Sequence, residues 1–178
     1  SRPENANQRL NVAGPLGGTG LRFVPVEHDA NQSDSPEEAK NVAELVQTLL
    51  SNATWTDKQC QIGLVTLEDI LIVAPYNAQV SLLLRELPKG SRVGTVDKFQ
   101  GQEAPVVIYS MATSTAQDAP RGMEFLYSGN RLNVATSRAQ CVTVLVASPA
   151  LFDVLCKTPR QMELANAFCR YLEMSEVI

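Results

Sequence analysis

Short apolar runs alternate with stretches of helical periodicity along most of the chain. Residues 70–74 and 106–111 are almost entirely apolar, as expected for strands covered on both faces in a parallel sheet. Residues 21–26, 92–96 and 142–147 are the other strand candidates. The pattern therefore predicts a sheet of about five strands.

Helical patterns lie between these strands. Ser35 and Pro36 open the first one, and its apolar stripe runs through residues 42–50. Further helical patterns cover residues 77–87, 131–139, 149–156 and 160–173. Strands that alternate with helices indicate an α/β fold with a mainly parallel sheet, helices on both faces and right-handed crossovers.

Two segments lack such a pattern. Residues 1–20 are polar and then glycine-rich, so we predict a flexible linker or loop there and a folded domain over residues 21–178. No Gly-Lys-Ser/Thr follows these glycines, and a phosphate-binding loop is therefore not predicted. Residues 112–128 are predicted to form a long loop.

Composition narrows the range of functions. The 178 residues correspond to one domain, and an apolar share of 44% predicts a sizeable core. A net charge of −4 excludes a generic polyanion binder. The charge is uneven, because residues 85–138 hold seven basic and five acidic residues, whereas residues 1–84 hold five and ten. A bound anion is therefore expected in the middle third.

Neither a membrane span nor a metal site is predicted. No apolar run approaches the roughly 18 residues of a span, and no charged-then-apolar leader opens the chain. We expect an intracellular protein, either cytoplasmic or nuclear (or nucleoid-associated), without membrane contact. The four cysteines form no Cys-x-x-Cys pair and His28 is the only histidine, so zinc ligands are lacking and buried free thiols are expected.

Three polar clusters accompany the central strands. Ligands of open α/β sheets bind at the carboxyl ends of the strands, so residues that follow strands are the candidates. The first cluster, residues 74–79, reads Ala-Pro-Tyr-Asn-Ala-Gln. A simple helix cap by Asn77 is the plainer interpretation of this cluster alone.

The second cluster, residues 93–103, reads Val-Gly-Thr-Val-Asp-Lys-Phe-Gln-Gly-Gln-Glu. Asp97 and Gln100 have the spacing of a helix cap and its return partner, and Gly101 allows close backbone approach. A plain turn needs only two or three such residues, so a functional loop is favoured over a capped turn.

The third cluster, residues 130–139, contains two arginines. Arg131 and Arg138 are seven residues apart, so they share one face of a helix. A solvated basic face is one interpretation. A planar guanidinium also suits a phosphate, and an arginine that points out of one domain can serve a nucleotide held by another.

Together the three clusters resemble motifs IV, V and VI of the second RecA-like motor domain of superfamily 1 helicases. Within that superfamily the sequence is similar to the branch of RNA-decay and Okazaki-fragment-processing helicases. The Val-Asp-x-Phe-Gln-Gly-x-Glu core of motif V and the Arg-Leu-Asn-Val-Ala-x-Ser-Arg-Ala run of motif VI are both present. The resemblance covers residues 60–148 strongly and implies a RecA-like α/β fold of the P-loop NTPase type.

The resemblance implies a nucleotide site. Arg138 matches the arginine finger, which reaches across the inter-domain cleft to the γ-phosphate, and Arg131 matches a preceding basic residue that contacts phosphate or braces the motif. Glu103 and Gly101 match positions near the ribose and phosphates. Gln100 matches a coupler between cleft and strand.

It also implies a nucleic-acid track. Thr95 matches a hydroxyl that contacts the nucleic-acid backbone. The motif IV residues Tyr76, Asn77 and Gln79 are expected to line the same track or the nucleotide cleft. Single-stranded DNA or RNA is therefore an expected partner.

The remaining parts of the ATPase are missing from this sequence. It has no Gly-Lys-Ser/Thr loop and no Asp-Glu pair after an apolar strand, which in this family belong to the first motor domain. ATP with Mg²⁺ is thus expected to be held mainly by that domain, as the partner of this one. The chain alone is expected to be inactive, and its start at Ser1 fits the carboxyl half of a longer motor.

Two other functions stay open. The chain could be a non-catalytic, degenerate helicase-like domain that acts as a scaffold or regulatory interaction module. It could also be a stand-alone nucleotide-binding domain of the doubly wound type, although the glycine fingerprint of that type is missing.

Overall fold

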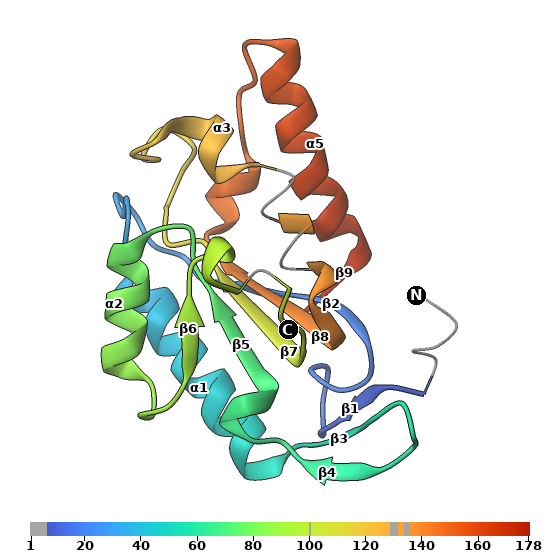
Figure 1. The fold of residues 1–178 in the computed structure, drawn as a ribbon. Coiled ribbons are helices and arrows are strands. Elements are labelled where there is room, and N and C mark those ends of the chain that lie inside the picture. Colours follow the sequence, from blue (N-terminus) through green and yellow to red (C-terminus); the bar gives the residue numbers. More distant parts are fainter. Residues whose placement is uncertain (1–6, 100, 129–131, 134–135) are drawn as a thin grey trace.

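The computed structural model describes residues 7–99, 101–128, 132–133 and 136–178. Its centre is a six-stranded sheet in the order β6-β5-β7-β8-β2-β9, in which every pair of neighbours is parallel (Figure 1). The strands are β2 (Gly20–Pro25), β5 (Ile70–Val73), β6 (Arg92–Gly94), β7 (Ala104–Ser110), β8 (Ala139–Ala147) and β9 (Ser175–Val177). The predicted α/β, RecA-like sheet is confirmed, with β9 as a strand that the apolar pattern did not indicate.

Alternate residues of each central strand enter two separate cores. Ile70 and Ile72 belong to one core, and Leu71 and Val73 belong to the other. The first face is covered by α1 (Pro36–Asn52) and α2 (Asn77–Glu86). The second face is covered by α3 (Gly122–Leu126), α5 (Pro159–Met174) and the 3₁₀ turns η3 (Val96–Phe99) and η4 (Pro149–Phe152). Among these described helices, none is long and apolar enough to cross a bilayer.

Three predicted elements differ from the observed ones. Residues 149–156 form only the short turn η4, because Leu151 alone is fully buried there and Leu155 is exposed. Residues 112–128 are not loop throughout, since they contain α3. In the predicted helix 131–139, the described residues 132–133 and 136–137 are helical, but Arg138 lies in a turn and Ala139 begins β8, so Arg138 is not on a helix face as expected.

The N-terminal segment packs on the domain where a linker was expected. Its strand β1 (Arg9–Asn11) joins β3 (Thr54–Thr56) and β4 (Ile62–Leu64) in a small antiparallel sheet. Leu10 and Leu16 are buried in the first core. Residues 7–20 are therefore held by burial of these two side chains.

Arg22 of β2 organises the glycine-rich loop. Only 8% of its side chain is exposed, and its guanidinium donates to the carbonyl oxygens of Pro15, Gly17 (2.5 Å) and Thr19 (3.3 Å). Glu176 of β9 lies 3.5 Å from Nε. The loop wraps a buried cation, which satisfies both the guanidinium and the carbonyl groups.

Two buried tyrosines fasten elements on the second face. The Tyr171 hydroxyl of α5 donates to the backbone oxygens of Arg22 (3.2 Å) and Thr143 (3.3 Å), and the Tyr127 hydroxyl donates to that of Leu151. Burial raises the pKa of both phenols. Both therefore remain neutral donors at ordinary pH.

Arg22→Met should unfold more easily than the wild type. The substitution leaves the loop carbonyls without their charged donor, so we expect the free energy of unfolding to fall by about 2–4 kcal/mol. Urea unfolding at neutral pH measures this change. Arg160→Met is the matched control, because Arg160 pairs with Glu163 at a side-chain exposure of 65% and should change stability by less than about 1 kcal/mol. Equal losses in the two variants would contradict the role of Arg22.

Candidate functional site

The segment between β6 and β7 runs from one end of the parallel strands to the other. Gly94, the last residue of β6, pairs with Val73 of β5, which in turn pairs with Tyr109 of β7. The first residue of β7 is five residues before Tyr109, so the two ends are about 16 Å apart along the strands. Thr95 and Glu103 therefore lie at opposite ends of the sheet.

This connection is packed tightly onto the second face. Val96 and Phe99 of η3 are buried in the second core. A Cβ on Gly94 would come within 2.4 Å of the Lys98 side chain and 3.0 Å of the Phe99 ring, so glycine is needed for this approach. Gly101 has φ +81°, a conformation in which other residues are strained.

A cavity of about 330 Å³ lies at the carboxyl ends of β5 and β6. Tyr76, Asn77 and Thr95, three of the predicted nucleic-acid residues, line it together. Tyr76 is the capping residue of α2 and Asn77 its first residue, so the interpretation of Asn77 as a cap is wrong. Asn77 is exposed and Thr95 half-buried, which leaves both side chains accessible to a ligand.

The same cavity contains two residues that sequence reasoning missed. The Phe125 ring of α3 lies 5.6 Å from the Tyr76 ring, and Cζ of Arg121 lies 4.0 Å over the Phe125 ring. An arginine and an aromatic residue four positions apart were visible in the sequence. Only the placement of α3 beside the start of α2 brings them to the cavity.

Gln79, the fourth predicted nucleic-acid residue, is fully buried. Its Nε2 donates to Oγ of Ser110 (2.8 Å), and its Oε1 accepts from the backbone N–H of Ser35 (2.8 Å). A direct contact with nucleic acid would require these bonds to break. In the structure Gln79 joins α2 to the beginning of α1 and the end of β7.

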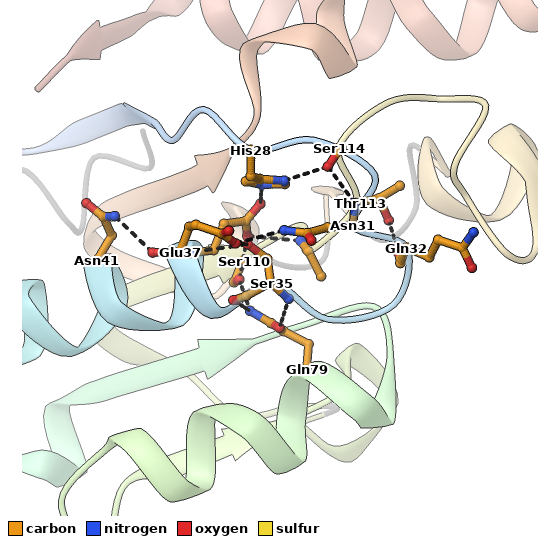
Figure 2. A network of polar contacts seen from close by, with 12 residues as sticks. His28, Asn31, Gln32, Ser35, Glu37, Asn41, Gln79, Ser110, Thr113 and Ser114 are labelled. Atoms are coloured by element: carbon orange, nitrogen blue, oxygen red, sulfur yellow. Dashed lines mark hydrogen bonds and ion pairs between the residues drawn. The ribbon is translucent and has the colours of Figure 1, made fainter.

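Gln79 belongs to a buried polar network centred on the Glu38 carboxylate, drawn from close by in Figure 2. Glu38 accepts from Oγ of Ser110 (2.6 Å) and from the backbone N–H of Ala112 (2.9 Å), and Nε2 of His28 lies 3.0 Å from it. The side chains of Glu38 and His28 are both fully buried. Such a carboxylate is tolerated only because its oxygens are hydrogen-bonded.

The network extends to the loop that precedes α1. Nδ1 of His28 lies 2.7 Å from Oγ of Ser114, which also accepts from the backbone N–H of Asn31 (2.9 Å). Ala112 has φ +67°, which is unfavourable for a residue with a Cβ. The bond from its N–H to Glu38 helps to hold that conformation.

Neighbouring Glu37 is exposed and has a different environment. A hydrogen bond from its own backbone lowers the pKa of Glu37, slight burial opposes this, and bonds from Asn31 (2.8 Å) and Ser35 (3.0 Å) lower it further. Glu38 lies four residues before Val42 on the buried stripe of α1, whereas Glu37 lies off that stripe, so helical periodicity favours Glu38 as the buried glutamate. The bonds of its carboxylate depend on how α1 packs against the end of β7.

Arg138 lies at the amino ends of the strands. Its backbone oxygen accepts from the N–H of Ala104 (3.0 Å), which ties it to the start of β7. Its Nη1 donates to the backbone oxygen of Gln102 (3.2 Å), and its Nε is buried without a hydrogen-bond partner among the described residues. Within the described part of the chain, the guanidinium therefore makes a single side-chain hydrogen bond.

Glu103 is exposed beside this arginine. Its carboxylate accepts from Nε2 of Gln140 (3.4 Å). Arg92, at the start of β6, donates to Oε1 of Gln102 (2.8 Å), so two arginines converge on Gln102. Sequence reasoning did not single out Arg92, whose place at this end follows from the pairing of β6.

The predicted site residues thus fall into two groups. Thr95, Tyr76 and Asn77 follow strands, whereas Glu103 and Arg138 precede them. The expectation that the candidate residues follow strands is wrong for Glu103 and Arg138, because the motif V segment runs back to the start of β7 and Arg138 precedes β8. Gln100 and Arg131 lie outside the described residues.

The described residues contain no group of three or more histidine, cysteine, aspartate or glutamate side chains that could hold a metal ion.

A protein-family comparison matches residues 21–150 to a model described as "AAA domain". This range includes the cavity, the buried network and Arg138.

The sequence is similar to proteins that are named as helicases or as a regulator of transcripts. The chain is 30% identical over 146 residues to "DNA replication ATP-dependent helicase/nuclease JHS1" of Arabidopsis thaliana, which covers 78% of this chain and 10% of that protein. It is 31% identical over 173 residues to "Putative helicase MOV-10" of Gallus gallus (84% and 17%). It is 34% identical over 124 residues to "Regulator of nonsense transcripts 1 homolog" of Arabidopsis thaliana (68% and 9%). The chain thus spans less than a fifth of the length of each of these relatives.

Glu38→Gln should destabilise the domain. The amide keeps one acceptor oxygen, but it loses the charge and its NH₂ group must face either Nε2 of His28 or the donors of Ser110 and Ala112, so we expect a loss of about 2–4 kcal/mol in the free energy of unfolding. Chemical denaturation provides the measurement. Glu37→Gln, one residue away and exposed, is the control and should have a much smaller effect. If both variants matched the wild type, the network would not be a structural link.

Proposed function

Because this chain belongs to the AAA domain family of superfamily 1 helicases, as a second RecA-like motor domain, we propose that it supplies an arginine finger and part of the nucleic-acid track of an ATP-driven translocase. The observation that carries this proposal is that the packed segment between β6 and β7 has a different pair of polar residues at each of its ends. Arg138 and Glu103 lie at one end of that segment, and Thr95 lies at the other with Asn77.

The end with Arg138 is proposed to face the nucleotide. ATP supplies the phosphoryl group, and charge develops on its oxygens in the transition state. Among the described residues, the guanidinium of Arg138 donates only to the backbone oxygen of Gln102, so it fits an additional anionic acceptor. Glu103 and Gly101 are proposed to lie near the ribose and phosphates. Gln100 and Arg131 stay predictions for the same region.

The first motor domain is the proposed partner at this end. The phosphate loop and the Mg²⁺ ligands would come from it, since this sequence contains neither Gly-Lys-Ser/Thr nor an Asp-Glu pair after an apolar strand. The chain without that domain is then expected to hydrolyse no ATP. A motor of this kind would act where ATP and nucleic acid occur together, in the cytoplasm or with the chromosome.

The end with the cavity is proposed to hold single-stranded nucleic acid. The Thr95 hydroxyl and the Asn77 amide are accessible donors suited to phosphate oxygens. The relatives named above include a DNA helicase and a regulator of transcripts, so either DNA or RNA is compatible with the family.

The connection between β6 and β7 is proposed to couple the two ends. Val96 and Phe99 of this connection are buried in the second core. We therefore propose that the connection moves as one unit, so that a displacement of Glu103 also displaces Thr95. Domain closure on ATP and opening after hydrolysis would then shift the grip on the strand.

Arg138→Ala in the intact protein that contains this chain should lower the turnover number for ATP hydrolysis by about 10³–10⁵-fold, because an arginine finger stabilises transition-state charge. A phosphate-release assay with saturating single strand measures it. Arg160→Ala, an exposed arginine on α5, is the control and should retain turnover. Near-normal turnover in Arg138→Ala would favour a scaffold or regulatory domain instead.

A further inference from the structure

Three side chains at the cavity form a continuous stack. Tyr76 is 7% exposed and fixed at the start of α2, and the Phe125 ring packs against it at 5.6 Å. Cζ of Arg121 lies 4.0 Å from the centre of the Phe125 ring, well inside the range of a cation–π contact. The stack therefore proceeds from the interior of the domain to its surface.

Arg121 is positioned by the Phe125 ring, and its charge is not paired with a carboxylate among the described residues. It is exposed, and among the described residues it makes no hydrogen bond or ion pair. A surface arginine ordinarily gains from a carboxylate partner, whereas this one is positioned by an aromatic ring. As far as the described residues show, one face of its planar group and its five N–H donors have no partner in the chain and can serve a ligand.

The remaining cavity wall indicates which part of a nucleotide fits there. Asp97 is exposed at the cavity, and its carboxylate repels a phosphate while it accepts bonds from the amino groups of bases. Thr95 and Asn77 are neutral donors on the same wall. A volume of about 330 Å³ is at the lower end of the range for small-ligand sites, which suits one nucleotide.

We propose that Arg121, supported by Phe125, is a stacking platform for one base of the single strand on this domain. This inference rests on the proposed function of the cavity as part of a nucleic-acid track. The base lies on the outer face of the guanidinium with its edge toward Asp97, and the flanking phosphates lie toward Asn77 and Thr95. Bases with an exocyclic amine (adenine, cytosine and guanine) are preferred over thymine and uracil, because Asp97 accepts from that amine.

Stacking and simple charge attraction can be separated with the variant Arg121→Lys. Lysine keeps the positive charge but lacks the planar group, and the exposed position tolerates the change. Arg160→Lys is the matched control, an exposed arginine of α5 outside the cavity. Phe125→Leu removes the support for Arg121 and is compared after its folding is checked by circular dichroism.

The experiment measures binding of short fluorescein-labelled single strands by fluorescence anisotropy. It uses the intact protein that contains this chain, with oligo-dA, oligo-rA, oligo-dT and an abasic strand of equal length. We expect Arg121→Lys and Phe125→Leu to weaken binding to oligo-dA or oligo-rA by about 5- to 100-fold, the range for loss of one stacked base. Binding to the abasic strand should change by less than about twofold, since its phosphate contacts remain. Wild type should prefer oligo-dA to oligo-dT, and Asp97→Asn should reduce that preference.

Three results would overturn the platform. In the first, Arg121→Lys binds oligo-dA and oligo-rA as tightly as the wild type does. In the second, Arg121→Lys loses affinity by the same factor for abasic and base-containing strands, which would indicate a phosphate contact. Failure of the wild type to bind any of these strands would instead overturn the proposed nucleic-acid track, and the platform with it. In either of the first two cases the wild type still binds the strands, so only the platform would be overturned.

Discussion

The central strands are parallel and buried on both faces, and this constraint fixes where every connection must run. A parallel strand can be followed by its neighbour only if the chain returns along the full strand length, so each connection crosses one face of the sheet. The segment from Thr95 to Glu103 leads from β6 past β5 to the start of β7, and it contains the 3₁₀ turn η3 and Gly101. Two chemically different ends of the domain are joined by this short route.

The buried carboxylate of Glu38 provides hydrogen-bond acceptors where the parallel strands end. The carboxyl ends of β2, β5 and β7 meet at one edge, where the backbone leaves the sheet and loses its ladder partners. Glu38 and His28 bind the segment after β7, and Gln79 links that segment to α2. The start of α2, which carries Tyr76 and Asn77, is therefore positioned by a network that a ligand need never touch. Gln79 is better understood as part of this support than as a residue of the cavity wall.

Charge is arranged accordingly. The excess of basic residues in the middle third of the chain does not form one patch, since Arg92 and Arg138 lie at the amino ends of the strands and Arg121 at the cavity. At the amino ends both arginines donate hydrogen bonds to Gln102, whereas at the cavity Arg121 lies on the Phe125 ring. The first arrangement suits a polyanionic phosphate group and the second suits a flat, weakly polar surface.

The sequence alone determined the fold class, the five main strands and the long helices, because apolar runs and helical periodicity report burial directly. Motifs IV, V and VI were also readable, since they depend on local residue order. Tertiary structure alone decided which groups bond the buried carboxylate of Glu38, that Asn77 and Thr95 share a cavity with Arg121 and Phe125, and that Arg138 lies about one strand length away. These facts depend on the register of a helix on a sheet and on which strands are neighbours. Periodicity shows which face of an element is buried, but contains no information on what it is buried against.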